Sequence, residues 1–171
     1  MLKNAGRNER TMDIQTLSQT YAVRRLGRDD VEIVYDLMRS NDIFYQYHPP
    51  FVTRKSILED MDALPPGKGM EDKYYVGFFE GDTLIAILDL IDGYPEKEIA
   101  MIGLLMTDTK RQRKGIGTTI VGELAVTLKA SGFRRIRIGV DKGNPQSNAF
   151  WQKNGFVTIR EETYILMERA L

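Results

Sequence analysis

The first half of the chain alternates short strand-like and helix-like patterns of hydrophobic positions. Residues 21–26 alternate loosely and predict a strand, and residues 31–38 carry apolar side chains at helical spacing behind two aspartates suited to an N-cap. Residues 41–50 are rich in aromatic side chains and end in two prolines, which predicts a loop, and a second helix is expected over 53–63. The predicted fold therefore opens with a strand and two helices.

The second half begins with three apolar runs separated by short turns, at 74–79, 84–91 and 99–106. Such short, glycine-containing gaps predict antiparallel neighbours. The pattern ends with a helix at 118–130, a strand at 133–140, a helix at 145–154 and two short strands within 156–167. A meander of strands followed by alternating helices and strands predicts an α/β (α+β) fold, with a mixed, mostly antiparallel central sheet and helices on both faces.

The N-terminal residues 1–19 are mostly polar and predict an extension with too little apolar content to pack. Residues 20–171 are then expected to form a single domain, which is ordinary for a chain of 171 residues. Met12 is a candidate alternative start to Met1.

Composition excludes several classes of protein. Lys plus Arg and Asp plus Glu both number 24, so the net charge is zero and nothing points to a nucleic acid or an anionic membrane as partner. No apolar stretch approaches the roughly 18 residues of a membrane span, and the polar N-terminus is unlike a signal peptide, so we expect a cytoplasmic protein. Without cysteine, and with His48 as the one histidine, the sequence offers neither a thiol nucleophile nor a Cys or multi-His metal site.

A glycine-rich loop at residues 112–117, Gln-Arg-Lys-Gly-Ile-Gly, joins the strand at 99–106 to the helix at 118–130. The first turn of a helix carries unpaired N–H groups and partial positive charge, and glycines let an anion approach that backbone closely. The spacing matches neither a Walker A loop nor a dinucleotide-binding fingerprint. A tight turn without a ligand is the alternative, but the flanking basic pair favours a site for a phosphate-bearing ligand.

Two segments of the sequence resemble signatures of the GNAT superfamily of acyl-CoA-dependent N-acyltransferases. Residues 112–117 match its pyrophosphate-loop pattern, (Q/R)-x-x-G-x-(G/A). Residues 144–156, Asn-Pro-Gln-Ser-Asn-Ala-Phe-Trp-Gln-Lys-Asn-Gly-Phe, resemble its second signature, an Asn-led helix that ends in Gly-Phe. The predicted order of strands and helices over about 20–169 is also similar to that fold.

The resemblance implies acetyl-CoA as the acyl donor and no metal. The pyrophosphate would lie on the amides that begin the helix, and the pantetheine arm would run beside the end of the preceding strand, where the next strand splays away. The residues implied in this binding are Leu105, Met106, Thr107, Gln112, Arg113, Lys114, Gly115, Ile116, Gly117, Thr118, Asn144 and Trp151.

The resemblance also implies direct transfer of an acetyl group to a primary amine, with no acyl-enzyme. Many relatives place a tyrosine acid where this sequence has Trp151, whose indole N–H is not a useful acid, so Tyr164 and Tyr75 become candidate proton donors. Asp89 interrupts an apolar run, where burial would raise its pKa, and is a candidate base. His48, in the aromatic segment, could also serve as the base, with a surface or core-edge histidine as the alternative. A buried carboxylate satisfied by a turn amide is the alternative for Asp89.

Aromatic and acidic residues outside the glycine-rich loop are candidates for binding the amine acceptor. Tyr45, His48 and Asp92 are candidate acceptor-binding residues, and a small-molecule amine is favoured, with a protein N-terminus also open. A catalytically weak acyl-CoA-binding sensor is the alternative to an enzyme. The last residues, 161–171, predict an edge strand that a second copy of the chain could pair with in a homodimer.

Overall fold

A computed structural model describes residues 10–171 and contains one seven-stranded sheet in the order β1-β2-β3-β4-β5-β7-β6. Neighbouring strands are antiparallel except β4 and β5, which are parallel. The strands are β1 (Ala22–Arg25), β2 (Lys73–Glu80), β3 (Thr83–Asp92), β4 (Ile99–Thr107), β5 (Arg135–Val140), β6 (Val157–Glu161) and β7 (Ile165–Ala170). The predicted mixed, mostly antiparallel sheet is confirmed.

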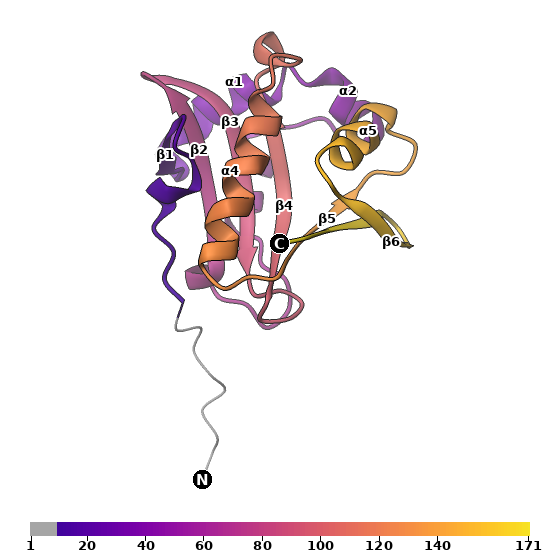
Figure 1. Cartoon of the computed structure of the whole chain (residues 1–171). Helices are drawn as coiled ribbons and strands as arrows, with labels where there is room; N and C mark the ends of the chain where they lie inside the picture. Colours follow the sequence, from indigo (N-terminus) through magenta and orange to yellow (C-terminus); the bar gives the residue numbers. More distant parts are fainter. Residues whose placement is uncertain (1–9) are drawn as a thin grey trace.

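Helices cover both faces of this sheet, as predicted (Figure 1). The helices are α1 (Val31–Met38), α2 (Asp42–Tyr47), α3 (Arg54–Asp62), α4 (Ile116–Ala130) and α5 (Pro145–Lys153). Alternate residues of β3 point to opposite faces, so Leu88 joins the core beneath α4 and Ile87 joins the core beneath α1 and α3. Both residues are fully buried, which explains why the central strands read as continuous apolar runs.

The sheet opens between its two parallel strands. β4 and β5 are paired from Ile99 and Arg135 only as far as Ile102 and Ile138, although β4 continues to Thr107. The register between β3 and β4 also shifts at this point, which leaves Gly103 as the extra residue of a β-bulge opposite Asp89. Beyond Ile102 the edge of β4 therefore lacks a strand partner, and α5 lies beside the opening (Figure 1).

The aromatic segment at 41–50 is not simply a loop, and this prediction was wrong. Residues 42–47 form the short helix α2, and His48 is its C-cap residue. Phe44 and Tyr45 pack against the core beneath α1 and α3, so tertiary contacts override the modest helix propensity of the aromatic residues. The two prolines that follow His48 end the helix, as the sequence suggested.

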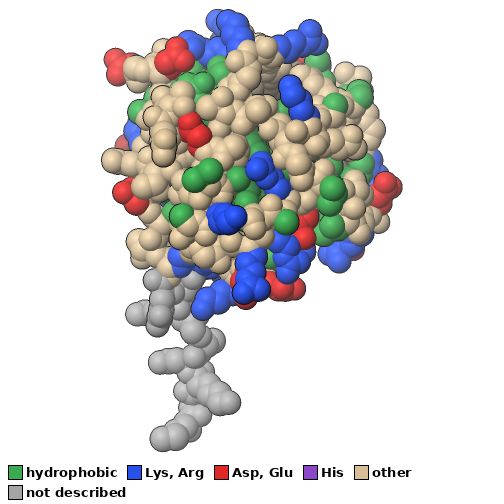
Figure 2. Space-filling model, in the orientation of Figure 1, with side chains coloured by type: hydrophobic (Ala, Val, Ile, Leu, Met, Phe, Trp, Pro, Cys, Tyr) green, Lys and Arg blue, Asp and Glu red, His purple; other side chains and the backbone are tan. Residues whose placement is uncertain are grey.

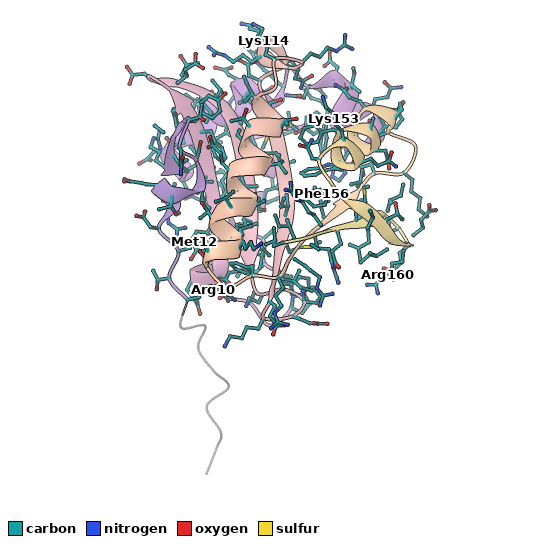
Figure 3. The ribbon with its side chains drawn as sticks, viewed as in Figure 1. Arg10, Met12, Lys114, Lys153, Phe156 and Arg160 are labelled. Carbon is teal, nitrogen blue, oxygen red and sulfur yellow. The ribbon has the colours of Figure 1, made fainter. Side chains whose placement is uncertain are left out.

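The boundary expected at residue 20 is also wrong for the residues just before it. Met12 and Leu17 are buried in the core beneath α4, and residues Ile14–Leu17 form a 3-10 turn. Figure 3 shows Met12 and Arg10 beside the end of α4 that lies far from Lys114. Residues 1–9 of the predicted extension lie outside the described part of the chain.

The C-terminal strand is not the edge that the sequence predicted. β7 lies between β5 and β6, so β6 is the outer strand at this side of the sheet. Every residue of β6 is exposed. No helix within residues 10–171 is both long and apolar enough to cross a membrane.

Candidate functional site

The main groove of the molecule lies at the opening between β4 and β5 and has a volume of about 680 Å³, a size typical of small-molecule sites. Its walls come from the end of β4, the start of α4, the start of α2 and the length of α5. They include Ser40, Asn41, Ile43, Phe44, Leu105, Met106, Thr107, Thr109, Gln112, Arg113, Gly115, Ile116, Gly117, Thr118, Asn144, Ser147, Phe150 and Trp151. We refer to these residues together as the main groove.

The loop before α4 presents free backbone donors to this groove. The first bond into α4 runs from the Thr119 N–H to the Gly115 carbonyl at 2.9 Å, and the amides of residues 116–118 have no backbone partner within the described residues. Gly115 has a φ of +79°, and a Cβ built there would meet nothing within 4 Å. The site thus combines open space, three unpaired amides and the positive end of a 15-residue helix dipole.

Gly117 is small for a different reason. A Cβ at this position would lie 2.9 Å from Cε2 of Phe150, on α5. The glycine therefore lets α4 and α5 approach each other across the groove. Both glycines were predicted to let a phosphate approach the backbone. Only Gly115 has the open space for this, because Phe150 lies against Gly117.

Gln112 is held by the protein itself. Its Nε2 donates to Oδ1 of Asn41 at 2.9 Å and to the Thr107 carbonyl at 3.4 Å, while Asn41 Nδ2 donates to the Leu37 carbonyl at 3.0 Å. Asn41 is buried. This network joins the loop to the end of β4 and to the start of α2, so Gln112 positions the loop. Asn41 was not singled out from the sequence, because its partner lies 71 residues away.

The second signature forms α5, and its first residue has a local task. The Asn144 side chain is the N-cap and accepts from the Ser147 N–H at 3.1 Å. Trp151 is buried and packs edge-on against Phe150 and Phe156, at centroid distances of 5.0 and 4.9 Å. Trp151 therefore joins the groove wall to the core.

Positive side chains lie at the end of the molecule where the loop lies, at the top of the view, and also at the opposite end (Figure 2). Arg113 borders the main groove, whereas Lys114 projects from the outer tip of the loop (Figure 3). Lys114 instead borders a neighbouring hollow together with Lys110 and Arg111. Of the twelve residues implied in acetyl-CoA binding, Lys114 is thus the one that the main groove does not include.

Asp89 lies next to the bulge in β4 and already has a cationic partner. Its Oδ2 accepts from Lys73 Nζ at 2.9 Å, and Lys73 also donates to the Ala63 carbonyl at 2.8 Å. Burial raises the pKa of the Asp89 carboxyl, and the nearby Lys73 ammonium opposes part of that rise. Asp89 Oδ1 and the Tyr75 hydroxyl are buried without a hydrogen-bond partner in the described chain. We call Lys73, Tyr75 and Asp89 the buried polar cluster.

Tyr45 also faces this side of the sheet. Its ring contacts Phe44 and Phe51 at centroid distances of 5.0 and 5.2 Å. Burial, with a further contribution from the Asp60 carboxylate, raises the pKa of Tyr45 to about 12. Tyr45 is therefore neutral at physiological pH.

Two candidates from distant parts of the sequence, His48 and Tyr164, come together in the structure. His48 Nδ1 lies 3.0 Å from Oδ1 of Asp141, the residue after β5, and the imidazole stacks with the Tyr164 ring at 6.4 Å between centroids. Phe44, a residue of the main groove, packs on the same imidazole at 5.1 Å. We call Phe44, His48, Asp141 and Tyr164 the imidazole cluster. Asp141 could not be found from the sequence, because no local pattern distinguishes it from a solvated turn residue.

Asp92 does not belong with these residues. It lies at the end of β3 opposite the start of β4, pairs with Ala100, and is fully buried. Its Oδ1 lies 3.1 Å from the Arg10 guanidinium. The predicted acceptor-binding role of Asp92 is therefore wrong, because the residue lies at the other end of β4 from the main groove.

The comparison with protein families defines the class of protein. The sequence model of the acetyltransferase (GNAT) family matches residues 33–156, more than half of the chain. The chain belongs to the acetyltransferase (GNAT) family, in which acetyl transfer from acetyl-CoA is the general reaction. A search of curated protein sequences gives no significant match.

Solved structures show the same fold. An acetyltransferase from Thermus thermophilus is 24% identical, with a TM-score of 0.75, over 87% of this chain and 96% of the other. The PaiA N-acetyltransferase from Thermoplasma acidophilum, solved with coenzyme A, is 22% identical, with a TM-score of 0.67, over 87% and 98%. The ribosomal-protein-S18-alanine N-acetyltransferase from Escherichia coli is 16% identical, with a TM-score of 0.62, over 87% and 92%.

Proposed function

We propose that this acetyltransferase binds acetyl-CoA in the main groove and transfers the acetyl group directly to a primary amine, most simply that of a small molecule. The observation that carries the proposal is the start of α4, where three unpaired amides follow Gly115 and the space beside Gly115 is open. A diphosphate is a suitable ligand for such a helix start, because it satisfies the amides and the helix dipole together.

The remaining length of the groove suits the rest of the donor. Beyond Ile102 the edge of β4 lacks a strand partner, so the backbone groups of residues 103–106 on that edge are available to amides of the pantetheine arm, as in strand addition, whereas the Thr107 carbonyl accepts from Gln112. Asn144 uses its Oδ1 for the helix cap, which leaves its Nδ2 as a donor toward the groove. The thioester would then end near the bulge at Gly103.

The chemistry requires an oxyanion donor and a deprotonated amine. A backbone N–H of Leu105 or Met106 is our candidate for the oxyanion, since it needs no particular side chain. Asp89 lies one strand away, and its Oδ2 is occupied by Lys73. We therefore assign Asp89 an electrostatic role, attracting an ammonium group to the bulge. Tyr164 stays the candidate donor of a proton to the thiolate.

The test is acetyl-CoA binding by calorimetry, followed in the same sample by detection of free CoA thiol. The acceptor panel is spermidine, an L-amino acid, an aminoglycoside and a short peptide with a free N-terminus. We expect saturable binding and release of CoA that at least one amine accelerates. The small-molecule assignment predicts that the peptide is not the best acceptor.

Each other outcome has a definite meaning. Binding without amine-stimulated release would replace the enzyme with an acyl-CoA sensor. Absence of binding would overturn the assignment of the groove. Fastest release with the peptide would replace the small molecule with a protein N-terminus.

A further inference from the structure

The imidazole cluster spans the opening in the sheet. His48 follows α2, whose residues Ile43 and Phe44 form one wall of the main groove. Asp141 follows β5 and lies three residues before Asn144, which belongs to the opposite wall. The contact between His48 and Asp141 therefore bridges two segments that the strand pairing leaves apart.

The partners of His48 determine its tautomer. A carboxylate only accepts hydrogen bonds, so neutral His48 donates its Nδ1–H to Asp141 and carries its lone pair on Nε2. Within residues 10–171 no hydrogen bond occupies Nε2. The Asp141 side chain is 13% exposed and the His48 side chain 44%, so the carboxylate is sheltered while the imidazole reaches solvent.

Two aromatic rings, from separate parts of the sequence, restrict the orientation of the imidazole. Phe44 lies one helical turn before His48, and its ring is tilted by 32° to the imidazole. Tyr164, between β6 and β7, lies nearly parallel to it, at 28°. A ring held by a carboxylate and two aromatic contacts has the arrangement of an oriented proton acceptor.

We propose that His48 is the catalytic base of this enzyme and that Asp141 is its positioning residue. This inference rests on the proposed function. One proton leaves the acceptor ammonium for His48 Nε2, and the freed nitrogen lone pair forms the C–N bond to the thioester carbonyl carbon. The C–S bond breaks, the thiolate takes a proton from the Tyr164 hydroxyl, the second proton of the nitrogen restores that hydroxyl, and the imidazolium returns its proton to solvent.

Because His48 is the one histidine in the sequence, its imidazole can be observed alone. Protein without a histidine tag, labelled with ¹⁵N-histidine, is expected to show the Nδ1–H tautomer by NMR. Asp141→Ala is expected to shift the signals toward the Nε2–H tautomer, and Asp141→Glu to restore part of the wild-type pattern. An unchanged tautomer in Asp141→Ala would overturn the positioning role.

The kinetic test uses the panel amine that releases CoA fastest, at saturating acetyl-CoA. His48→Gln is expected to lower kcat about 100-fold, the lower end of the range of general base catalysis, and Asp141→Ala about 10-fold. The acetyl-CoA affinity of both variants should stay within about twofold of wild type. Gln46→Ala, an exposed change on the same helix, is the matched control and is expected to keep the wild-type rate.

The outcomes separate this inference from the proposed function. His48→Gln that keeps at least half of the wild-type kcat would overturn the base assignment alone. Wild-type protein that turns over none of the amines would overturn the proposed function and the base together. If His48→Gln fails to fold, the decision falls to Asp141→Ala, whose lowered kcat with a changed tautomer supports the proposal and whose wild-type kcat overturns it.

Discussion

The main groove and the imidazole cluster are built in different ways. The main groove depends on backbone: a glycine of positive φ, the free amides of one helix and the unpaired edge of one strand. The imidazole cluster depends on side chains from α2, from the residue after β5 and from the turn between β6 and β7. A backbone site is encoded by short contiguous motifs, whereas a side-chain site is assembled from residues that the sequence keeps far apart.

The comparison predicts that the largest effect comes from the backbone of the groove. Gly115→Val is expected to weaken acetyl-CoA binding at least about 50-fold. A β-branched side chain is strained at positive φ, and it would fill the open space beside the helix start. Each tenfold loss of affinity corresponds to about 1.4 kcal/mol of binding free energy. Calorimetry with acetyl-CoA measures the effect. Gly122→Ala, within α4 and with nothing within 4 Å of the added Cβ, is the matched control and should bind normally. Equal affinity in both variants would contradict the backbone account.

A change in the buried polar cluster should affect the reaction with the amine and leave acetyl-CoA binding unchanged. Asp89→Asn is expected to lower kcat/KM for the amine about 10-fold while leaving the acetyl-CoA affinity unchanged. The wild-type rate should fall as the pH drops through the Asp89 pKa, which burial holds above its usual 3.8, because the neutral acid no longer attracts an ammonium. The variant should lack that decline, and an identical pH profile would return Asp89 to a purely structural role.

A variant of Asp92 tests whether this residue stabilises the fold or binds the acceptor. Asp92→Asn is expected to lower the free energy of unfolding by about 1–3 kcal/mol, because the Arg10 guanidinium loses its carboxylate in a buried setting. Urea denaturation measures this loss. The kcat/KM for the amine should stay at the wild-type value, and a selective loss of activity at unchanged stability would restore Asp92 to the acceptor site.

The smallest expected effect lies outside both sites, on the segment before β1. Glu123 of α4 accepts hydrogen bonds from the hydroxyls of Ser18 and Thr20 and from the Gln19 N–H. Burial raises the pKa of Glu123, but these hydrogen bonds outweigh it and the net pKa lies below its usual 4.5. Glu123→Gln should therefore cost about 1 kcal/mol of stability above pH 4.5.

The pH dependence of that cost has a definite sign. A carboxylate with a lowered pKa stabilises the folded state above the unfolded pKa, and the contribution is lost as the pH falls through the folded value. The difference between wild type and Glu123→Gln should accordingly shrink below pH 4.5 in thermal unfolding. A difference independent of pH would show that the charge is not involved.

The sequence was sufficient for the central strands of the sheet, because they are apolar runs between glycine-containing turns, but not for the order of β6 and β7 at its edge. It was also sufficient for the start of α4, since the amides and glycine that make that site are adjacent in the chain. It failed for α2 because packing of Phe44 and Tyr45, not local propensity, makes this segment helical. Met12 and Leu17 were missed for a similar reason, as two apolar residues in a polar stretch give no periodic signal.

In the candidate site, too, residues that are adjacent in the sequence were predicted better than contacts between distant residues. Eleven of the twelve residues implied in acetyl-CoA binding border the main groove, which includes all of them except Lys114. His48 and Tyr164 were candidates for separate tasks, and their contact could not be foreseen because 116 positions separate them in the numbering. Asp92 shows the converse, since strand-end position alone does not say which end of the sheet bears the site.

Four residue pairs join β4 to β5, and this seam divides the sheet into a part made of β1 to β4 and a part made of β5 to β7. A molecule bound in the groove would cross this seam, because it would contact β4 and α4 on one side and α5 on the other. Occupancy of the groove would then hold the two half-sheets together. Folding and donor binding would become linked quantities, with the melting temperature rising with the logarithm of donor concentration once the groove is saturated.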